Sequence, residues 1–285
     1  MAVIRALAAL VFATLPVEAA WAHLSGPHEP LILALRRAEI VVIVRAEVET
    51  RRTAEGAETP VERVAVLDGT RTPTRFVLAQ SGAHVHRLRQ GESYIVPVKR
   101  SVSGRLLVDF SSEAPVAVEP SEARWLGPVI RGLRRGDARA TRQLDVSDAL
   151  RRGSPVSVRL AMERASLALS GVEPASGPVR SSWVRALAAR AADAALDPVA
   201  RSEAFQVATG LDALAVVAAV GEAALTWTPS ALANQAVAFF ERQGSDASRS
   251  HLMRCAQGLV SGVSSETRTR CQRVIDRGPA GASAP

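Results

Sequence analysis

Cysteine, lysine and aromatic residues are scarce in this chain of 285 residues. Its two cysteines exclude a disulfide-dense scaffold and a cysteine-rich zinc module. No apolar run reaches the roughly 18 residues that a membrane-spanning helix needs. Lysine occurs once, as Lys99, and the other 34 basic residues are arginines, a bias that GC-rich codon usage explains better than selected chemistry. The hydrophobic fraction of 47% excludes a disordered chain and suffices for one or two folded domains.

The first 22 residues have the pattern of a secretory signal peptide. Arg5 supplies the positive start, and residues 6–17 are apolar but too short to span a bilayer. Ala20 and Ala22 place small residues at both positions that a signal peptidase reads. We therefore expect cleavage after Ala22 and a periplasmic or secreted protein without a transmembrane segment. The alternative is that this stretch forms a buried N-terminal helix.

The two cysteines fit an oxidising compartment. Cys255 and Cys271 fall in two expected helices, residues 246–258 and 265–276, on either side of a loop near residues 261–262. In an antiparallel hairpin the two cysteines lie at similar heights, within reach of one disulfide. A bond that closes a loop of this size stabilises a fold by about 3 kcal/mol. The alternative is a pair of free buried thiols.

Short strands dominate the segment from about residue 39 to residue 118. Apolar residues there form a buried β-branched run or alternate with polar ones, and Asp68-Gly69 and Ser103-Gly104 are turn signals. Residues 30–38 are expected to form a short helix before the first strand. Five or six short strands predict a small closed barrel or sandwich. The expected strands are 39–48, 61–67, 75–78, 93–98, 105–110 and 115–118.

Three of these stretches resemble strands of bacterial netrin-like, TIMP-like OB-fold domains: residues 37–46 (RAEIVVIVRA), 64–70 (VAVLDGT) and 91–97 (GESYIVP). The resemblance implies an OB-like barrel, which we place at residues 23–123. Family members that inhibit metalloproteases chelate the catalytic zinc with an N-terminal cysteine. This half of the chain has no cysteine, so the inhibitory activity does not carry over with the barrel.

The remainder, residues 124–277, is predicted to be all helical, which makes the chain an α+β protein. Residues 197–205 are similar to the start of a HEAT-like repeat helix. Successive cap-proline pairs lie 43 and 31 residues apart, so an irregular HEAT-like array of paired helices and an ordinary bundle both remain open. Residues 278–285 are expected to be a disordered tail. The cap-proline pairs are Ser154-Pro155, Asp197-Pro198 and Thr228-Pro229. The expected helices are 156–169, 182–196, 199–209, 211–224 and 230–243, followed by the two cysteine helices.

Three histidines form a candidate metal site. Cleavage after Ala22 makes His23 the mature N-terminus, where its α-amine and imidazole can chelate one copper ion. In a strand, His84 and His86 would project to the same side, and imidazole and amine donors suit Cu(II) or Zn(II). The alternative is that these two histidines are polar surface on a loop.

Catalytic motifs are missing from the sequence. It contains no Gly-x-Ser-x-Gly, His-Glu-x-x-His or Gly-x-x-x-x-Gly-Lys, and its 28 acidic residues are scattered. The expected disulfide leaves the two cysteines without a catalytic role. We therefore expect that the protein is not an enzyme and assign no cofactor.

Arginine is concentrated in residues 126–190, which hold 12 arginines and 5 acidic residues, a net charge of +7. The flanking segments 23–125 and 191–285 carry net charges of +1 and −1. A cluster of guanidinium groups suits phosphate or carboxylate partners, and the alternative is a solvated helical face. No aromatic residues are interleaved to stack on bases, so a nucleic-acid partner is not expected. The candidate anion-binding residues are Arg131, Arg134, Arg135, Arg139, Arg142, Arg151 and Arg152.

The sequence thus predicts an exported binding or interaction protein without catalytic activity. Its arginine-rich helical face docks an acidic partner protein or an anionic component of the cell envelope. Two alternatives stay open. One is a copper or zinc protein that uses His23, and the other is an inhibitor of a secreted protease that acts through the TIMP-like domain.

Overall fold

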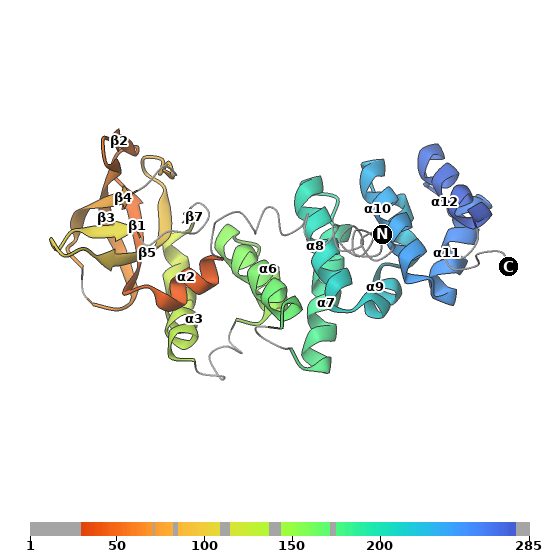
Figure 1. Ribbon diagram of the computed structural model, residues 1–285, viewed down its shortest axis with the longest axis horizontal. Helices are drawn as coiled ribbons and strands as arrows, with labels where there is room; N and C mark the ends of the chain where they lie inside the picture. The colour runs from red at the N-terminus through yellow and green to blue at the C-terminus, as the bar shows by residue number, and fades with distance from the viewer. Residues whose placement is uncertain are drawn as a thin grey trace, which may run out of the picture. The chain divides into compact units, whose positions relative to one another are not determined.

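The computed structural model contains a β-barrel and a series of helices (Figure 1). It confirms the expected α+β class, a small barrel followed by helices. The chain divides into two compact units, one that ends at Arg164 and one that begins at Ala165. The expected signal peptide and C-terminal tail lie outside the described residues. Those residues are 30–70, 72–81, 85–108, 115–136, 144–171 and 175–277.

Five strands of the first unit close into a barrel. Neighbouring strands pair in the order β1-β3-β4-β6-β5, and a β5–β1 pairing closes the ring. The β4–β6 pair is parallel and the others are antiparallel, which is the Greek-key arrangement of an OB-like barrel. Two short strands pair with strands of the barrel: β2 (Arg51–Thr53) pairs with β3, and β7 (Val116–Ala117) pairs with β5. The barrel strands are β1 (Ile40–Ala46), β3 (Gly56–Asp68), β4 (Arg75–Ser81), β5 (Ser93–Arg100) and β6 (Leu106–Val108).

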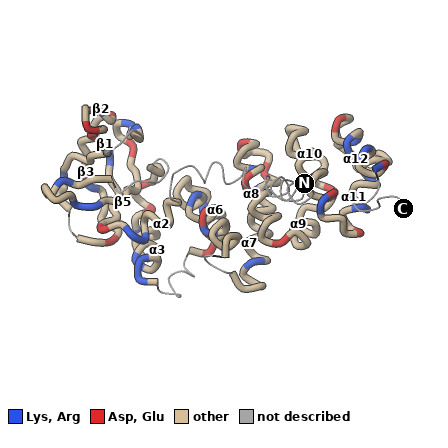
Figure 2. The backbone as a smooth tube through the Cα atoms, viewed as in Figure 1, with Lys and Arg blue, Asp and Glu red and all other residues tan. Residues whose placement is uncertain are grey.

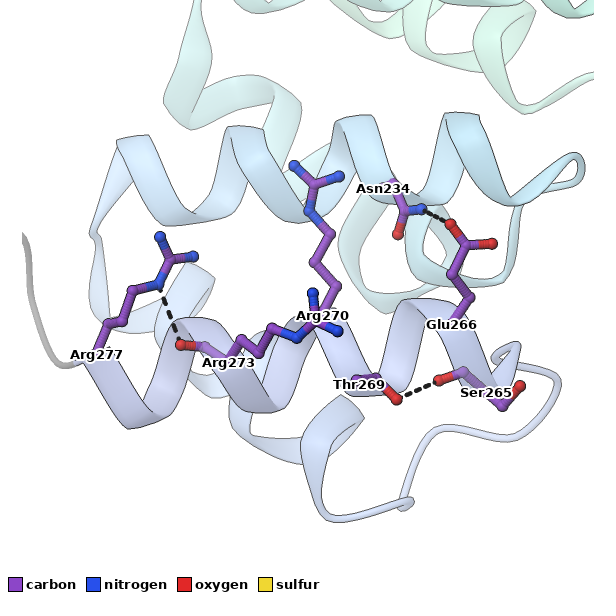
Figure 3. Close-up of a pocket in the computed structure, with 7 residues that line it drawn as sticks. All are labelled: Asn234, Ser265, Glu266, Thr269, Arg270, Arg273 and Arg277. Atoms are coloured by element: carbon purple, nitrogen blue, oxygen red, sulfur yellow. Dashed lines mark hydrogen bonds between the residues drawn. The ribbon is translucent and has the colours of Figure 1, made fainter.

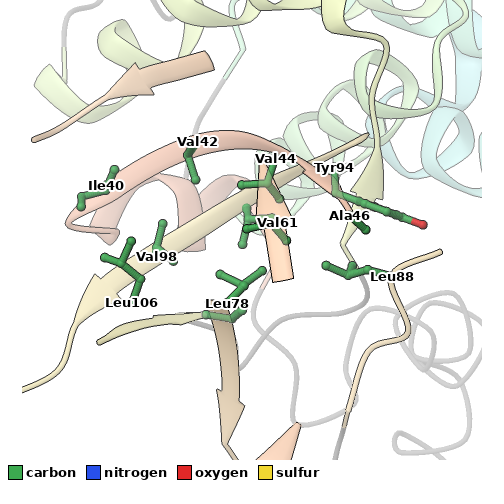
Figure 4. Packing of buried hydrophobic residues seen from close by; sticks show 12 residues of the cluster. Ile40, Val42, Val44, Ala46, Val61, Leu78, Leu88, Tyr94, Val98 and Leu106 are labelled. Atoms are coloured by element: carbon green, nitrogen blue, oxygen red, sulfur yellow. The ribbon is translucent and has the colours of Figure 1, made fainter. Parts of the chain in front are cut away.

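Aliphatic side chains and one tyrosine fill the barrel (Figure 4). Alternate residues of β1 contribute to this core, because successive side chains of a strand point to opposite faces. Val41 and Ile43, on the other face of β1, are also fully buried. The β-branched run of β1 therefore suits a strand with core on both sides. The barrel core consists of Ile40, Val42, Val44, Ala46, Val61, Leu78, Leu88, Tyr94, Val96, Val98, Leu106 and Val108.

Helices of the first unit pack against the barrel. The helix α3 contacts β3, and α2 contacts α3 and β5. The buried carboxylate of Glu163 on α6 accepts a hydrogen bond from the backbone N–H of Ile32 at 2.8 Å, so α6 holds the start of α2. The compact unit therefore extends to Arg164, beyond residue 123, where the sequence suggested that the β-rich domain ends. The helices are α2 (Leu31–Arg37), η1 (Pro120–Glu122), α3 (Ala123–Arg135), α5 (Val146–Arg152) and α6 (Pro155–Leu169), which continues into the second unit.

The second unit consists of packed helices. The helix α7 packs against α8 and α9, while α10 packs against η2, α11 and α12. Phe205 contacts Trp227 and Phe239 edge to face, with ring centroids 5.3 and 5.4 Å apart. All three rings are buried, so these aromatic pairs belong to its core. The elements are α7 (Gly177–Ala192), α8 (Pro198–Leu211), α9 (Ala213–Val220), η2 (Gly221–Thr226), α10 (Ser230–Gln243), α11 (Asp246–Ala256) and α12 (Ser265–Arg277).

Two of the three expected helix caps are confirmed. The side chains of Ser154 and Asp197 accept hydrogen bonds from the first turns of α6 and α8. The prediction for Thr228 was wrong, because α10 begins at Ser230 and its N-cap residue is Pro229. The carbonyl of Thr228 instead accepts a hydrogen bond from Arg201.

The expected disulfide is present between α11 and α12. Cys255 and Cys271 are bonded, their Cα atoms are 6.2 Å apart, and both residues are fully buried. No helix in the described part of the chain has the length and apolar character needed to cross a membrane.

Candidate anion-binding site

The arginines of α3 that were predicted to bind anions bond to the barrel. Arg131 donates to the carbonyl of Leu67 at 3.1 Å. Arg134 donates to the carboxylate of Asp68 at 2.7 Å and to the carbonyl of Ala38 at 2.6 Å. These two guanidinium groups therefore attach α3 to the end of β3 and to the residue that follows α2.

The other predicted arginines differ in their surroundings. Arg151 forms an ion pair with Asp148 on the same helix, and the Arg152 guanidinium lies 4.9 Å from the ring centre of Trp125. Arg135 is exposed at the end of α3. These side chains do not form one continuous unpaired surface. Arg139 and Arg142 lie outside the described residues.

The predicted metal site falls largely outside the described residues, because His23 and His84 are not among them. His86 is half-buried, and its backbone N–H and carbonyl both bond to the side chain of Gln80, at 2.8 and 2.9 Å. Among the described residues, no three or more His, Cys, Asp or Glu side chains are grouped to hold a metal ion. The metal site stays a prediction.

The surface of the barrel carries charges of both signs (Figure 2). Several of its arginines pair with glutamates on adjacent segments. Where these pairs lie, positive and negative charges alternate on the surface and create no extended positive field. The pairs are Arg45–Glu62, Arg75–Glu47 and Arg105–Glu58.

A pocket between α10 and α12 gathers arginines that the sequence analysis did not select (Figure 3). Arg270, Arg273 and Arg277 follow one another at three- and four-residue steps, so they share a face of α12 with Glu266. Helical geometry puts these four residues within an arc of about 60°. The pocket has a volume of about 490 Å³. Its lining residues are Asn234, Ser265, Glu266, Thr269, Arg270, Arg273 and Arg277.

Neighbouring groups compensate two of the three arginines. Arg277 forms an ion pair with Glu241 of α10, with 3.1 Å between Nη2 and Oε1. Arg270 interacts electrostatically with Glu266. The side chain of Arg273 has no hydrogen-bond or ion-pair partner among the described residues. The pocket therefore keeps an uncompensated positive charge beside two further guanidinium groups.

Glu266 is tied to the opposite wall. It accepts hydrogen bonds from the Ser230 hydroxyl at 2.6 Å and from Nδ2 of Asn234 at 2.7 Å. These hydrogen bonds, and to a lesser degree the charge of Arg270, lower the pKa of the Glu266 carboxyl below its usual value. Glu266 thus stays ionised and connects α12 to the start of α10.

Comparisons with known proteins assign no function to this pocket, because no family model, curated protein or solved structure matches the chain.

Charge counting over long segments missed this pocket. Residues 191–285 have a net charge of −1, which conceals the local excess of arginine in α12. The informative signal was the helical spacing of Arg270, Arg273 and Arg277 within one short helix.

Proposed function

We propose that this chain is an exported, non-enzymatic binding protein that holds an anionic ligand in the pocket between α10 and α12. The supporting observation is the row of Arg270, Arg273 and Arg277 along a pocket of about 490 Å³, with Arg273 free of partners among the described residues. Guanidinium groups bind phosphate and carboxylate oxygens through paired, charge-assisted hydrogen bonds.

Two features support export. The first 22 residues have a signal-peptide pattern, and the Cys255–Cys271 disulfide is typical of proteins in oxidising compartments.

The chemistry of Glu266 favours binding over catalysis. A general base works best when its pKa lies near the working pH, but the pKa of this carboxyl is lowered. Both of its oxygens already accept hydrogen bonds, from Ser230 and Asn234. In this proposal Glu266 shapes the pocket wall.

Calorimetric titration of the exported protein with inorganic phosphate at low ionic strength tests the proposal. We expect saturable binding that weakens with added salt. Loss of one charge-assisted contact in Arg273→Gln should weaken binding about tenfold or more. Arg249→Gln is the matched control, because Arg249 is exposed on α11 and does not line the pocket.

Two results would overturn the proposal. One is the absence of phosphate binding at low ionic strength. The other is an equal loss of affinity in Arg273→Gln and Arg249→Gln, since that would indicate attraction to net charge and not to this pocket.

A further inference from the structure

The buried amide of Asn234 uses only its donor side. Asn234 is 8% exposed, and its Nδ2 donates to Oε1 of Glu266 at 2.7 Å. Its Oδ1 is buried and has no hydrogen-bond donor among the described residues. Buried polar atoms are rarely left without a partner, because each such atom lowers stability. An unpaired acceptor in the wall of a pocket is therefore evidence for a ligand that supplies the donor.

Glu266 determines which way this amide points. An ionised carboxylate only accepts hydrogen bonds, so the NH₂ group of Asn234 must face Glu266 and Oδ1 must face elsewhere. Figure 3 shows the Asn234 side chain directed from α10 toward α12, on the side where Arg270 and Arg273 lie. The pocket thus offers one fixed acceptor close to several cationic donors.

We infer that the ligand carries a hydroxyl group beside its anionic group, as in a phosphorylated sugar or polyol. This inference rests on the proposed function and adds the chemical class of the ligand. The anionic group bonds to Arg270 and Arg273, and the hydroxyl donates to Oδ1 of Asn234. A polar ligand is further favoured because none of the seven lining residues is aromatic, which leaves a nucleotide base without a stacking partner there.

Three probes on the unaltered protein separate the contributions: inorganic phosphate, glucose 1-phosphate and cyclohexyl phosphate. Cyclohexyl phosphate has a similar ring and the same anionic group but no ring hydroxyl. Because a site that hydrogen-bonds a hydroxyl discriminates against the analogue that lacks it, we expect glucose 1-phosphate to bind about tenfold tighter or more.

A variant then tests whether Asn234 is the residue that distinguishes glucose 1-phosphate from cyclohexyl phosphate. Asn234→Leu has the same number of side-chain heavy atoms and no acceptor, so its affinities for glucose 1-phosphate and cyclohexyl phosphate should become equal within about threefold, whatever change the two affinities share. Gln235→Leu is the control, because Gln235 lies next along α10, bonds to Ser202 and does not line the pocket. It should keep the preference. Circular dichroism checks that both variants are folded.

The outcomes separate this inference from the proposed function. If phosphate binds but glucose 1-phosphate binds no tighter than cyclohexyl phosphate, the inference is overturned and anion binding stands. If no anion binds, both fail. Vesicles of phosphatidylinositol and of phosphatidic acid show whether the ligand is a lipid headgroup or a free sugar phosphate. Recruitment of the protein to phosphatidylinositol vesicles alone supports a lipid headgroup. Binding of glucose 1-phosphate without recruitment to either kind of vesicle supports a free sugar phosphate.

Discussion

Arg201 is a buried cation of the second unit that bonds to two other segments. Only 3% of this residue is exposed. Its Nε donates to the carbonyl of Ala191 at 2.8 Å, at the end of α7, and its Nη1 donates to the carbonyl of Thr228 at 2.6 Å, just before α10. The guanidinium also lies 5.8 Å from the ring centre of Trp227. One side chain of α8 therefore joins three segments.

Replacing Arg201 with methionine keeps the unbranched stem and removes both hydrogen bonds. Hydrogen bonds to a charged group contribute about 1.5–3 kcal/mol each, so their loss amounts to about 3–6 kcal/mol. Relief from burying a charge offsets part of this, and we expect a net loss of about 2–4 kcal/mol. With a urea m value of about 1–3 kcal/mol/M, the unfolding midpoint should fall by roughly 1–2 M or more.

Urea unfolding followed by tryptophan fluorescence measures this change, because Trp227 lies beside the altered residue. Circular dichroism on the same samples shows whether the two compact units unfold in one step or in two. Arg185→Met is the matched control, since Arg185 is exposed on α7. Equal midpoints for Arg201→Met and the control would refute the reasoning, because the bonds to Ala191 and Thr228 would then contribute no net stability.

Three further predictions concern other parts of the fold. Removing the disulfide with the double change Cys255→Ala and Cys271→Ala, which are 16 residues apart, should cost about 3 kcal/mol in thermal unfolding, and an unchanged melting temperature would contradict this. Gly69→Ala should cost about 1–3 kcal/mol by the same assay, because Gly69 has φ of 98° and an added Cβ would lie 2.6 Å from the carbonyl oxygen of Glu39; full stability would refute the close approach. Burial raises the pKa of Glu163 above 4.5, so ionisation weakens the fold as pH rises from 4.5 through the raised native pKa. The urea midpoints of the native protein and of Glu163→Gln should therefore be compared as a function of pH. We expect Glu163→Gln to gain stability relative to the native protein as pH rises through that window, and the difference between the two to stay constant below it. A difference that is constant across the whole range would count against a raised pKa.

The barrel strands were predictable because one physical signal dominates them. In β1 the side chains that fill the barrel alternate with others that are also buried, so its β-branched run was recognisable before the fold was known. The turn at Gly69 was equally clear, since Asp-Gly follows an alternating segment. The short strand β2 was missed, because all three of its residues are exposed and have no apolar face to produce a pattern.

The association of α3 with the barrel was not predictable from local sequence. Gly127, Pro128 and Gly132 lower the helical propensity of this segment. Its arginines indicated a charged surface, but Arg134 reaches Asp68, 66 residues away in the sequence. A charge count cannot distinguish a cation that binds a ligand from one that attaches a helix to its own fold, because the partner is known only from the tertiary structure.

The disulfide and the arginine pocket are connected through α12. Only three residues of this helix are buried: Thr267, Cys271 and Val274. Apolar burial therefore contributes little to holding it, and the like charges of its arginine face repel one another. Cys271 lies on roughly the opposite side of the helix from that face, so its bond to α11 sets the rotation of α12 and directs the arginines toward α10. A helix with so little apolar contact can present these charges because a covalent bond holds its other side.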